Sequence, residues 1–199
     1  MTGVQTCALP IYWEREQFRG RELFGKTVGI VGMGRLGRIV AGYFQAFGMK
    51  VIGYDTDLRD FPEDIDRTDD IHRLLSRSDV VSLHVPYSPA TRHMLGDIEL
   101  RHMRPDAILL NTSRGGVVDE AALAEAIAEK RISGAAVDVL DNRFRSPLIE
   151  LSRSTDRVLI TPHIGGNTQE SCAKTDVFLA KKVVEVLREN SRAHSGPRG

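Results

Sequence analysis

The sequence is poor in cysteine, has no excess of either charge and contains no long apolar run. Two cysteines, Cys7 and Cys172, are too few for a disulfide framework or a zinc cluster, and they fit a reducing, cytoplasmic setting. Its 27 basic and 27 acidic residues balance, which argues against nucleic acid as a partner. No stretch approaches the roughly 20 apolar residues that span a bilayer. We therefore expect no membrane partner and no metal site.

Apolar, β-branched runs alternate with helical periodicity from Thr27 onward. Helical spacing predicts helices in RLGRIVAGYFQAFG, which Gly48 would end, in IHRLLSRS, in GDIELRHM and in DEAALAEAIAEKRI, which Asp119 would cap. A last helix is predicted from Thr168 to about Glu189. The apolar runs predict buried strands: TVGIVG, KVIGYD, DVVSLHV, AILLNT, SGAAVDVL and RVLITPH. This alternation predicts an α/β fold, a Rossmann-type doubly wound parallel sheet with helices on both faces.

The first predicted strand runs into GMGRLG, which contains Gly32, Gly34 and Gly37. A G-x-G-x-x-G motif alone is weak evidence, but this one follows a strand, opens a helix and precedes an acid, Asp55, at the end of the second strand. The glycines would allow a tight turn, close approach of a pyrophosphate and close packing of helix on strand. Asp55 would accept hydrogen bonds from ribose hydroxyls and repel a 2′-phosphate. The pattern predicts an NAD site.

Polar side chains follow the later strands, where ligands bind in sheets of this kind. His84 and Pro86 end the third strand, and an ordinary structural histidine and loop proline explain them equally well. Arg114 follows the fourth strand, and its planar guanidinium suits a carboxylate; a surface arginine in a turn is the alternative. Asp138 ends an apolar strand, where an unpaired charge is costly. His163 follows the last strand and is a candidate for proton transfer.

These segments resemble the D-isomer-specific 2-hydroxyacid dehydrogenases, including their phosphoglycerate dehydrogenase-like branch. The resemblance rests on GKTVGIVGMGRLG, SDVVSLHVP, ILLNTSRGGVVDEAAL, GAAVDV and LITPHIGG, in family order and spacing. It implies an NAD-dependent oxidoreductase acting on a D-2-hydroxyacid or 2-ketoacid, with 3-phosphoglycerate-like compounds included. It also implies that Arg114 grips the substrate and that His163 exchanges a proton with the carbonyl oxygen. The cofactor contacts it implies are Gly32, Gly34, Arg35, Leu36, Gly37, Asp55, His84, Val85, Pro86, Thr91, Thr112, Ser113, Arg114, Asp138, His163 and Gly165.

One position departs from the family pattern. Five residues after Asp138 the family usually places a glutamate that hydrogen-bonds the histidine, whereas this sequence has Arg143. A carboxylate would favour the charged imidazole, and an arginine disfavours it. We therefore expect His163 to be a weakened acid in this chain.

The family inserts its cofactor domain into a substrate domain, and the resemblance implies that most of the latter is missing. We expect an NAD-binding domain over residues 12–166, a helix of the truncated substrate domain over residues 167–190 and a disordered tail over residues 191–199. TGVQTCALPI resembles a translated sequencing adaptor, so residues 1–11 are expected to be a disordered artefact. Exposed apolar surface, weak NAD binding and little turnover would follow.

Two other function classes compete with this interpretation. A non-catalytic NAD-sensing module, similar to corepressor relatives of the same fold, is favoured by Arg143 and disfavoured by Arg114 and His163. A different Rossmann protein, such as a formate dehydrogenase or an adenosylhomocysteinase-like protein, is disfavoured by the pair NTSRG and TPHIGG. Family members usually dimerise through the cofactor domain, so a homodimer is expected.

Overall fold

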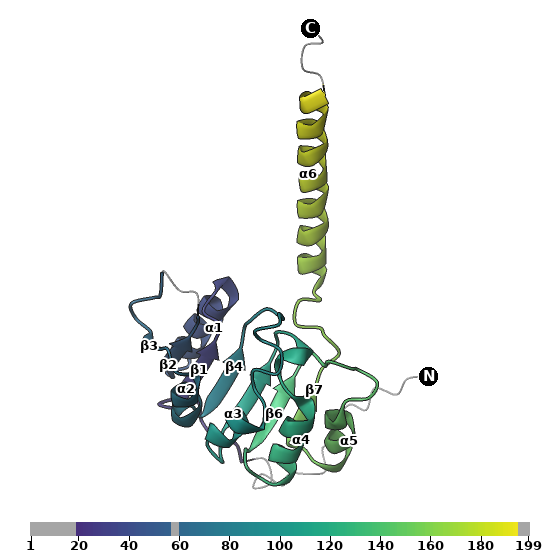
Figure 1. Cartoon of the computed structure of the whole chain (residues 1–199). Helices are drawn as coiled ribbons and strands as arrows, with labels where there is room; N and C mark the ends of the chain where they lie inside the picture. Colours follow the sequence, from purple (N-terminus) through teal and green to yellow (C-terminus); the bar gives the residue numbers. More distant parts are fainter. Residues whose placement is uncertain (1–18, 57–59, 195–199) are drawn as a thin grey trace, which may run out of the picture.

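Seven parallel strands form one sheet in the computed structural model, which describes residues 19–56 and 60–194, with side chains up to residue 188 (Figure 1). Their order is β3-β2-β1-β4-β5-β6-β7. The strands are β1 (Thr27–Val31), β2 (Lys50–Tyr54), β3 (Asp66–Thr68), β4 (Val80–Leu83), β5 (Ile108–Asn111), β6 (Gly134–Val137) and β7 (Val158–Ile160). The expectation for residues 1–11 lies outside the described residues. The predicted parallel α/β sheet is confirmed.

The helices begin where the sequence supplies caps. Asp119 accepts hydrogen bonds from the backbone N–H groups of Ala121 and Ala122, as its predicted capping role requires. Ser146 caps a helix that was not predicted and that has Pro147 in its first turn. The helices are α1 (Arg35–Ala46), α2 (Ile71–Arg77), α3 (Asp97–His102), α4 (Glu120–Ala128), α5 (Pro147–Ser154) and α6 (Gln169–His194), with a 3-10 turn at Gly115–Val117.

The direction of the chain across the sheet reverses at β1. From β1 the chain moves outward to β2 and β3, and it then returns to place β4 on the other side of β1. Right-handed crossovers consequently put α1 on one face of the sheet and α2, α3, α4 and α5 on the other. Helices therefore lie on both faces of the sheet, as predicted, with α1 alone on one face and the row α2 to α5 on the other. The reversal creates a crevice at the carboxyl ends of β1 and β4, the usual ligand position in such sheets.

The larger hydrophobic core lies between the sheet and the row of helices α2 to α5. Leu109 of β5 is completely buried in it, together with Leu75 of α2, Leu123 of α4 and Leu148 of α5. Side chains alternate along β5, so Leu110 faces the opposite side and packs on the smaller cluster beneath α1. Two cores on opposite faces hold the strand ends, and with them the loops that follow, in fixed positions.

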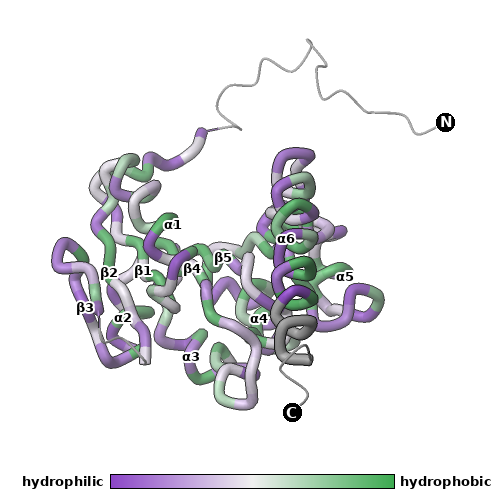
Figure 2. Tube along the Cα trace, turned by 90° about the horizontal axis from the view of Figure 1, so that it is seen from above, coloured by the Kyte–Doolittle hydropathy of each residue, from purple (hydrophilic) through white to green (hydrophobic). Residues whose placement is uncertain are grey.

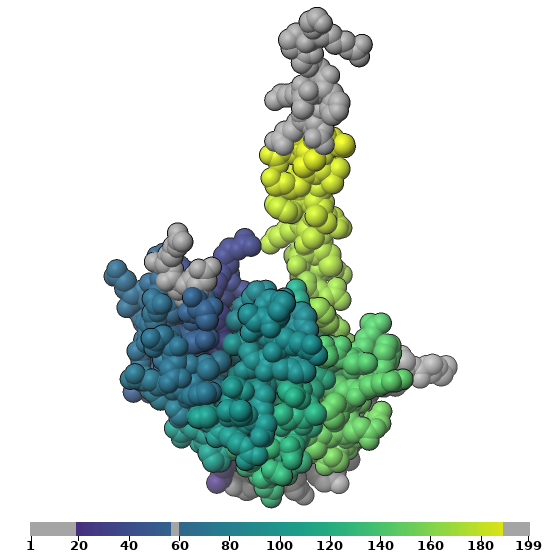
Figure 3. Space-filling model, viewed as in Figure 1, coloured from purple at the N-terminus to yellow at the C-terminus, as the bar shows by residue number. Residues whose placement is uncertain are grey.

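The C-terminal helix α6 projects away from the rest of the molecule (Figures 1 and 3). It passes the predicted end at about Glu189 and continues to His194, because no glycine or proline interrupts it before Gly196. Apolar and polar residues alternate along it (Figure 2). Its large apolar side chains are about half exposed, namely Val177, Phe178, Leu179, Val183, Val184, Val186 and Leu187. Within the described part of the chain, no helix has the length and apolar character needed to cross a membrane.

Replacing Leu109 with alanine tests the position of the main core. We expect Leu109→Ala to lower the free energy of unfolding by about 2–5 kcal/mol, because it leaves a cavity under the helix row. Leu159→Ala is the matched control, since Leu159 on β7 is 61% exposed and should cost less than about 1 kcal/mol. Urea denaturation followed by circular dichroism measures both. Equal losses in the two variants would contradict this account of the core.

Candidate active site

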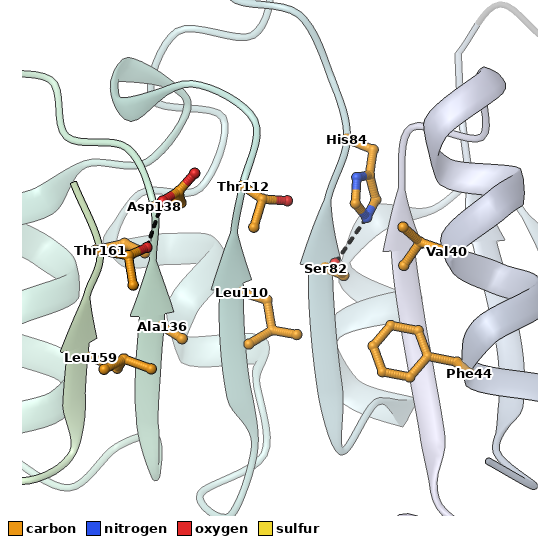
Figure 4. Close-up of a pocket in the computed structure, with 11 residues that line it drawn as sticks. Val40, Phe44, Ser82, His84, Leu110, Thr112, Ala136, Asp138, Leu159 and Thr161 are labelled. Carbon is orange, nitrogen blue, oxygen red and sulfur yellow. Dashed lines mark hydrogen bonds between the residues drawn. The ribbon is translucent and has the colours of Figure 1, made fainter. Parts of the chain in front are cut away.

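Residues of strands β4 to β7, of the loops that follow them and of helices α1 and α5 line two adjoining cavities. The smaller, of about 250 Å³, lies on the face that α1 covers only in part (Figure 4). The larger, of about 490 Å³, lies beside the loops that follow β5, β6 and β7. Asp138 and Thr161 line both cavities. The two cavities therefore share a wall, and this wall carries an ionisable group.

The glycine turn after β1 is shaped by contacts that exclude larger side chains. Gly32 has a φ of +93°, and a Cβ there would lie 2.6 Å from the carbonyl oxygen of His84, so only glycine fits. A Cβ on Gly37 would overlap the carbonyl oxygen of Gly32. Both glycines are therefore required by the protein itself, and they bring the start of α1 against the end of β4.

Gly34 differs from the other two glycines, because a Cβ at this position would meet no protein atom within 4 Å. Its φ of −64° is ordinary for any residue. Neither the space around its Cβ position nor the sign of its φ thus requires glycine at this N-cap of α1. A ligand that approaches the backbone N–H groups there gives one, since a phosphate needs this space. The turn consequently fits the pyrophosphate of a dinucleotide.

Asp55 lies beside the glycine turn, as its place at the end of β2 predicted. Its Oδ2 accepts a hydrogen bond of 2.8 Å from the backbone N–H of Met33. The carboxylate is thus held next to the position that a ribose would occupy if a pyrophosphate lay on the turn. The guanidinium of Arg38 donates to the carbonyl of Met33 at 3.0 Å and holds the turn from its other side.

His84 lies at the carboxyl end of β4 and lines the smaller cavity (Figure 4). Its Nε2 lies 2.9 Å from the hydroxyl of Ser82. Its Nδ1 is buried and has no hydrogen-bond partner among the described residues. Burial lowers the pKa of His84, so the ring is neutral near pH 7. A neutral histidine with one unsatisfied nitrogen is better suited to a hydrogen bond with a ligand than to carrying charge.

The predicted contacts after β4 belong to one loop. Val85 is half-buried and Pro86 is exposed. The hydroxyl of Thr91 donates to the carbonyl of Pro86 at 2.6 Å and accepts from the N–H of Ser88 at 2.8 Å. Thr91 therefore shapes this loop from within, and any contact it makes with a ligand comes in addition to that role. Arg35 and Leu36 are exposed at the start of α1.

Arg114 is positioned by an asparagine that the sequence analysis did not single out. Asn111 ends β5 and is 1% exposed. Its side-chain oxygen accepts from the N–H and the hydroxyl of Ser113, and its Nδ2 donates to the carbonyl of Arg114. Thr112 lies between them and lines the smaller cavity. A polar amide at the end of a buried strand is the signal that could have identified this role.

Arg114 lines the larger cavity. Its Nη1 donates to the carbonyl of Ser113 at 2.6 Å, which fixes one end of the planar group and leaves other donors for a ligand. A Cβ on Gly115 would overlap the backbone of Leu140 and Asp141. This close approach brings the loop that carries Arg114 against the loop that follows β6, so Arg114 and Arg143 line one cavity.

Asp138 holds the loop that carries His163. Its Oδ1 accepts from the hydroxyl of Thr161 at 2.5 Å and from the N–H of Ile164 at 2.9 Å, and its Oδ2 accepts from the N–H of Gly165 at 2.9 Å (Figure 4). Burial acts to raise the pKa of Asp138, but these three donors and the nearby His163 together hold that pKa below its ordinary value. The carboxylate is therefore charged and fully engaged.

His163 has a φ of +56°, a left-handed conformation that costs free energy in a residue with a side chain. The hydrogen bonds to Asp138 from Thr161, which precedes His163, and from Ile164 and Gly165, which follow it, stabilise the loop on both sides of this residue. His163 is exposed and lines the larger cavity together with Arg114. The structure thus brings the two predicted catalytic residues to the same cavity. A cluster of acidic, histidine or cysteine residues able to hold a metal ion is absent from the described residues.

Comparisons with known proteins agree with this geometry. The family model described as "D-isomer specific 2-hydroxyacid dehydrogenase, NAD binding domain" matches residues 5–165. A D-3-phosphoglycerate dehydrogenase of Methanocaldococcus jannaschii is 40% identical over 181 residues, which cover 88% of this chain and 34% of that protein. A glyoxylate reductase of Thermococcus litoralis is 40% identical over 176 residues, 86% of this chain and 52% of that protein. The chain thus spans about half or less of these relatives.

A solved structure shows the same arrangement of elements. The structure of a D-2-hydroxyisocaproate dehydrogenase superposes with a TM-score of 0.81 at 27% sequence identity. The superposition covers 90% of this chain and 58% of the other. The fold, the order of the strands and the glycine turn are therefore those of a dinucleotide-binding domain.

Substitution of Asp138 with asparagine tests how the loop of His163 is held. We expect Asp138→Asn to lower the free energy of unfolding by about 1–3 kcal/mol at neutral pH, because an amide cannot accept all three hydrogen bonds. The pKa of Asp138 is depressed in the folded protein. Its stabilisation is consequently complete above the ordinary carboxyl pKa and is lost as the pH falls through the folded value.

The measurement is urea denaturation of both proteins at neutral pH and at about pH 3.5, with Asp156→Asn as control because Asp156 is exposed. The difference between the unchanged chain and Asp138→Asn should be largest at neutral pH and smaller in acid. A difference that is independent of pH would show that the charge of Asp138 does not hold the loop.

Proposed function

The chain belongs to the D-isomer specific 2-hydroxyacid dehydrogenases through their NAD-binding domain, and from this membership we propose that it serves hydride transfer between NAD and a D-2-hydroxyacid or the corresponding 2-ketoacid. The observation that carries the proposal is the cavity lined by both Arg114 and His163, which shares Asp138 and Thr161 with the smaller cavity beside α1. Relatives named as 3-phosphoglycerate dehydrogenases and glyoxylate reductases support this substrate class.

The residues of the site have different tasks in this proposal. The glycine turn and the start of α1 bind the pyrophosphate, and Asp55 accepts hydrogen bonds from ribose hydroxyls and disfavours a 2′-phosphate. Bound NAD supplies or accepts the hydride. Arg114 binds the substrate carboxylate with the two parallel donors of its guanidinium. His163 holds the proton that passes to or from the oxygen on the adjacent carbon, where the fixed charge of Arg114 also stabilises developing negative charge.

Asp138 contributes as a positioning residue. Its oxygens are occupied by Thr161, Ile164 and Gly165, so it holds the backbone on both sides of His163. The family's usual carboxylate partner of this histidine is replaced by Arg143. A non-catalytic NAD-sensing role remains the second candidate, and that replacement is the observation in its favour.

A homodimer formed through the cofactor domain and a cytoplasmic setting complete the proposal. Large apolar side chains on and next to α1 support an interface, since they are more than half exposed: Leu36, Ile39, Tyr43 and Phe47. The small number of cysteines fits a reducing compartment.

Calorimetric titration tests the proposed function on the 199-residue chain. With NADH present, we expect the chain to bind oxamate, a monocarboxylate analogue of a 2-ketoacid. Arg114→Gln should weaken oxamate binding by about tenfold or more, because a charged hydrogen-bonded pair is lost. Any NADH-dependent reduction of a panel of 2-ketoacids should fall by about 100-fold or more in His163→Gln.

Arg92→Gln is the matched control, because Arg92 is exposed and outside both cavities. Oxamate affinity that is unchanged in Arg114→Gln would contradict the proposed function. The NAD-sensing role would be favoured by two results together. The unchanged chain would bind oxamate and NADH strongly without detectable reduction of a 2-ketoacid, and Arg143→Glu would not gain this activity.

A further inference from the structure

The larger cavity is lined by two arginines, whereas a single substrate carboxylate needs one as its partner. Its lining includes Arg114 and Arg143 together with His163. Asp138 is the one acidic residue among the lining residues. Its carboxylate is occupied by Thr161, Ile164 and Gly165, so it forms no ion pair with either arginine.

Both arginines lack an acidic partner within the described part of the chain, where ion pairs within 4.0 Å involve other residues. Arg131 shows the contrast, since it pairs with Asp97, Glu125 and Glu129. Arginine satisfies its five donors with carboxylates where these are available. Two arginines that line one cavity without such partners therefore form a site that is complementary to anions.

The guanidinium of Arg143 contacts an aromatic ring of the same loop. Its guanidinium carbon lies 4.9 Å from the centroid of the Phe144 ring. This cation–π contact stabilises the position of the guanidinium but offers its N–H donors no acceptor oxygen. The donors of Arg143 are thus available to a ligand in the cavity.

We propose that the cavity takes a 2-hydroxyacid or 2-ketoacid that carries a second anionic group, and that Arg143 selects for that group. The inference rests on the proposed function, in which Arg114 binds the carboxylate next to the reacting carbon. Arg143 then binds the second anion on the other side of the cavity. A cavity of about 490 Å³ has room for such a small dianion.

The proposal gives Arg143 a role in substrate selection. An acidic side chain there would repel a second anion, whereas an arginine attracts it and neutralises its charge. The loss of a carboxylate near His163 is thus accompanied by a gain in selectivity for substrates with two negative charges. Arg143 is a specificity-determining residue in this account and takes no part in proton transfer.

Calorimetric titration of two matched 2-hydroxyacids tests the proposal. Tartronate and D-glycerate share the carboxylate and the 2-hydroxyl, and tartronate carries a second carboxylate in place of the hydroxymethyl group. In the presence of NAD, the unchanged chain should bind tartronate more tightly than D-glycerate. Arg143→Gln should weaken tartronate binding about tenfold, as expected for a lost charged contact at an exposed side chain, and should change D-glycerate binding less than about twofold.

Two further variants separate this proposal from the proposed function. Arg145→Gln is the matched control, because Arg145 is exposed on the same loop but does not line the cavity, and it should leave both affinities unchanged. Arg114→Gln should weaken both ligands. If Arg143→Gln affects neither ligand, or both equally, while Arg114→Gln weakens both, the role of Arg143 is overturned and the proposed function stands. If the unchanged chain binds neither ligand, or Arg114→Gln has no effect, the proposed function and this inference fail together.

Discussion

The parallel pairing of all seven strands is the constraint on which the site depends. Strands that run in one direction end at one edge of the sheet, so every polar residue that follows a strand is delivered to the same edge. Asp55, His84, Arg114, Asp138 and His163 are far apart in the sequence and follow five different strands. Side chains buried on both faces fix the register of these strands. The geometry of the site consequently depends on the packing of the core.

Hydrogen bonds to two buried polar side chains fix the loops that follow the strands. Asn111 binds the loop of Arg114 through three hydrogen bonds, and Asp138 binds the loop of His163 through three more. Each polar side chain ends a strand and pulls the following loop back onto the sheet. The strained backbone of His163 is stable because its neighbours make these bonds. Positioning is thus carried by two residues that the reaction itself does not use.

The sequence predicted the elements that have strong local signals and missed those that depend on tertiary contacts. Apolar β-branched runs predicted six of the strands, whereas β3 consists of three residues, Asp66–Thr68, that only its neighbour β2 makes a strand. The sequence predicted that the glycine motif and Asp55 lie close together, because the motif is one short segment and the acid follows it at the spacing typical of this fold. The helix α5 was missed although Leu148, Ile149 and Leu151 give it an apolar side, because eight residues are too few for a clear helical period. The hydrogen bonds by which Asn111 and Asp138 hold the loops after their strands were not predicted, because the partner in a hydrogen bond cannot be read from sequence spacing.

The glycine turn offers the most direct test of the account, because protein packing requires Gly32 and Gly37 but leaves space at Gly34. The measurement is NAD affinity by calorimetry together with melting temperature, for Gly34→Val and for the control Gly42→Val, whose Cβ would also meet no protein atom. The account predicts that both variants melt within about 5 °C of the unchanged chain, while Gly34→Val alone loses NAD affinity by about tenfold or more. Unchanged NAD affinity in Gly34→Val would contradict the claim that a pyrophosphate lies on this turn.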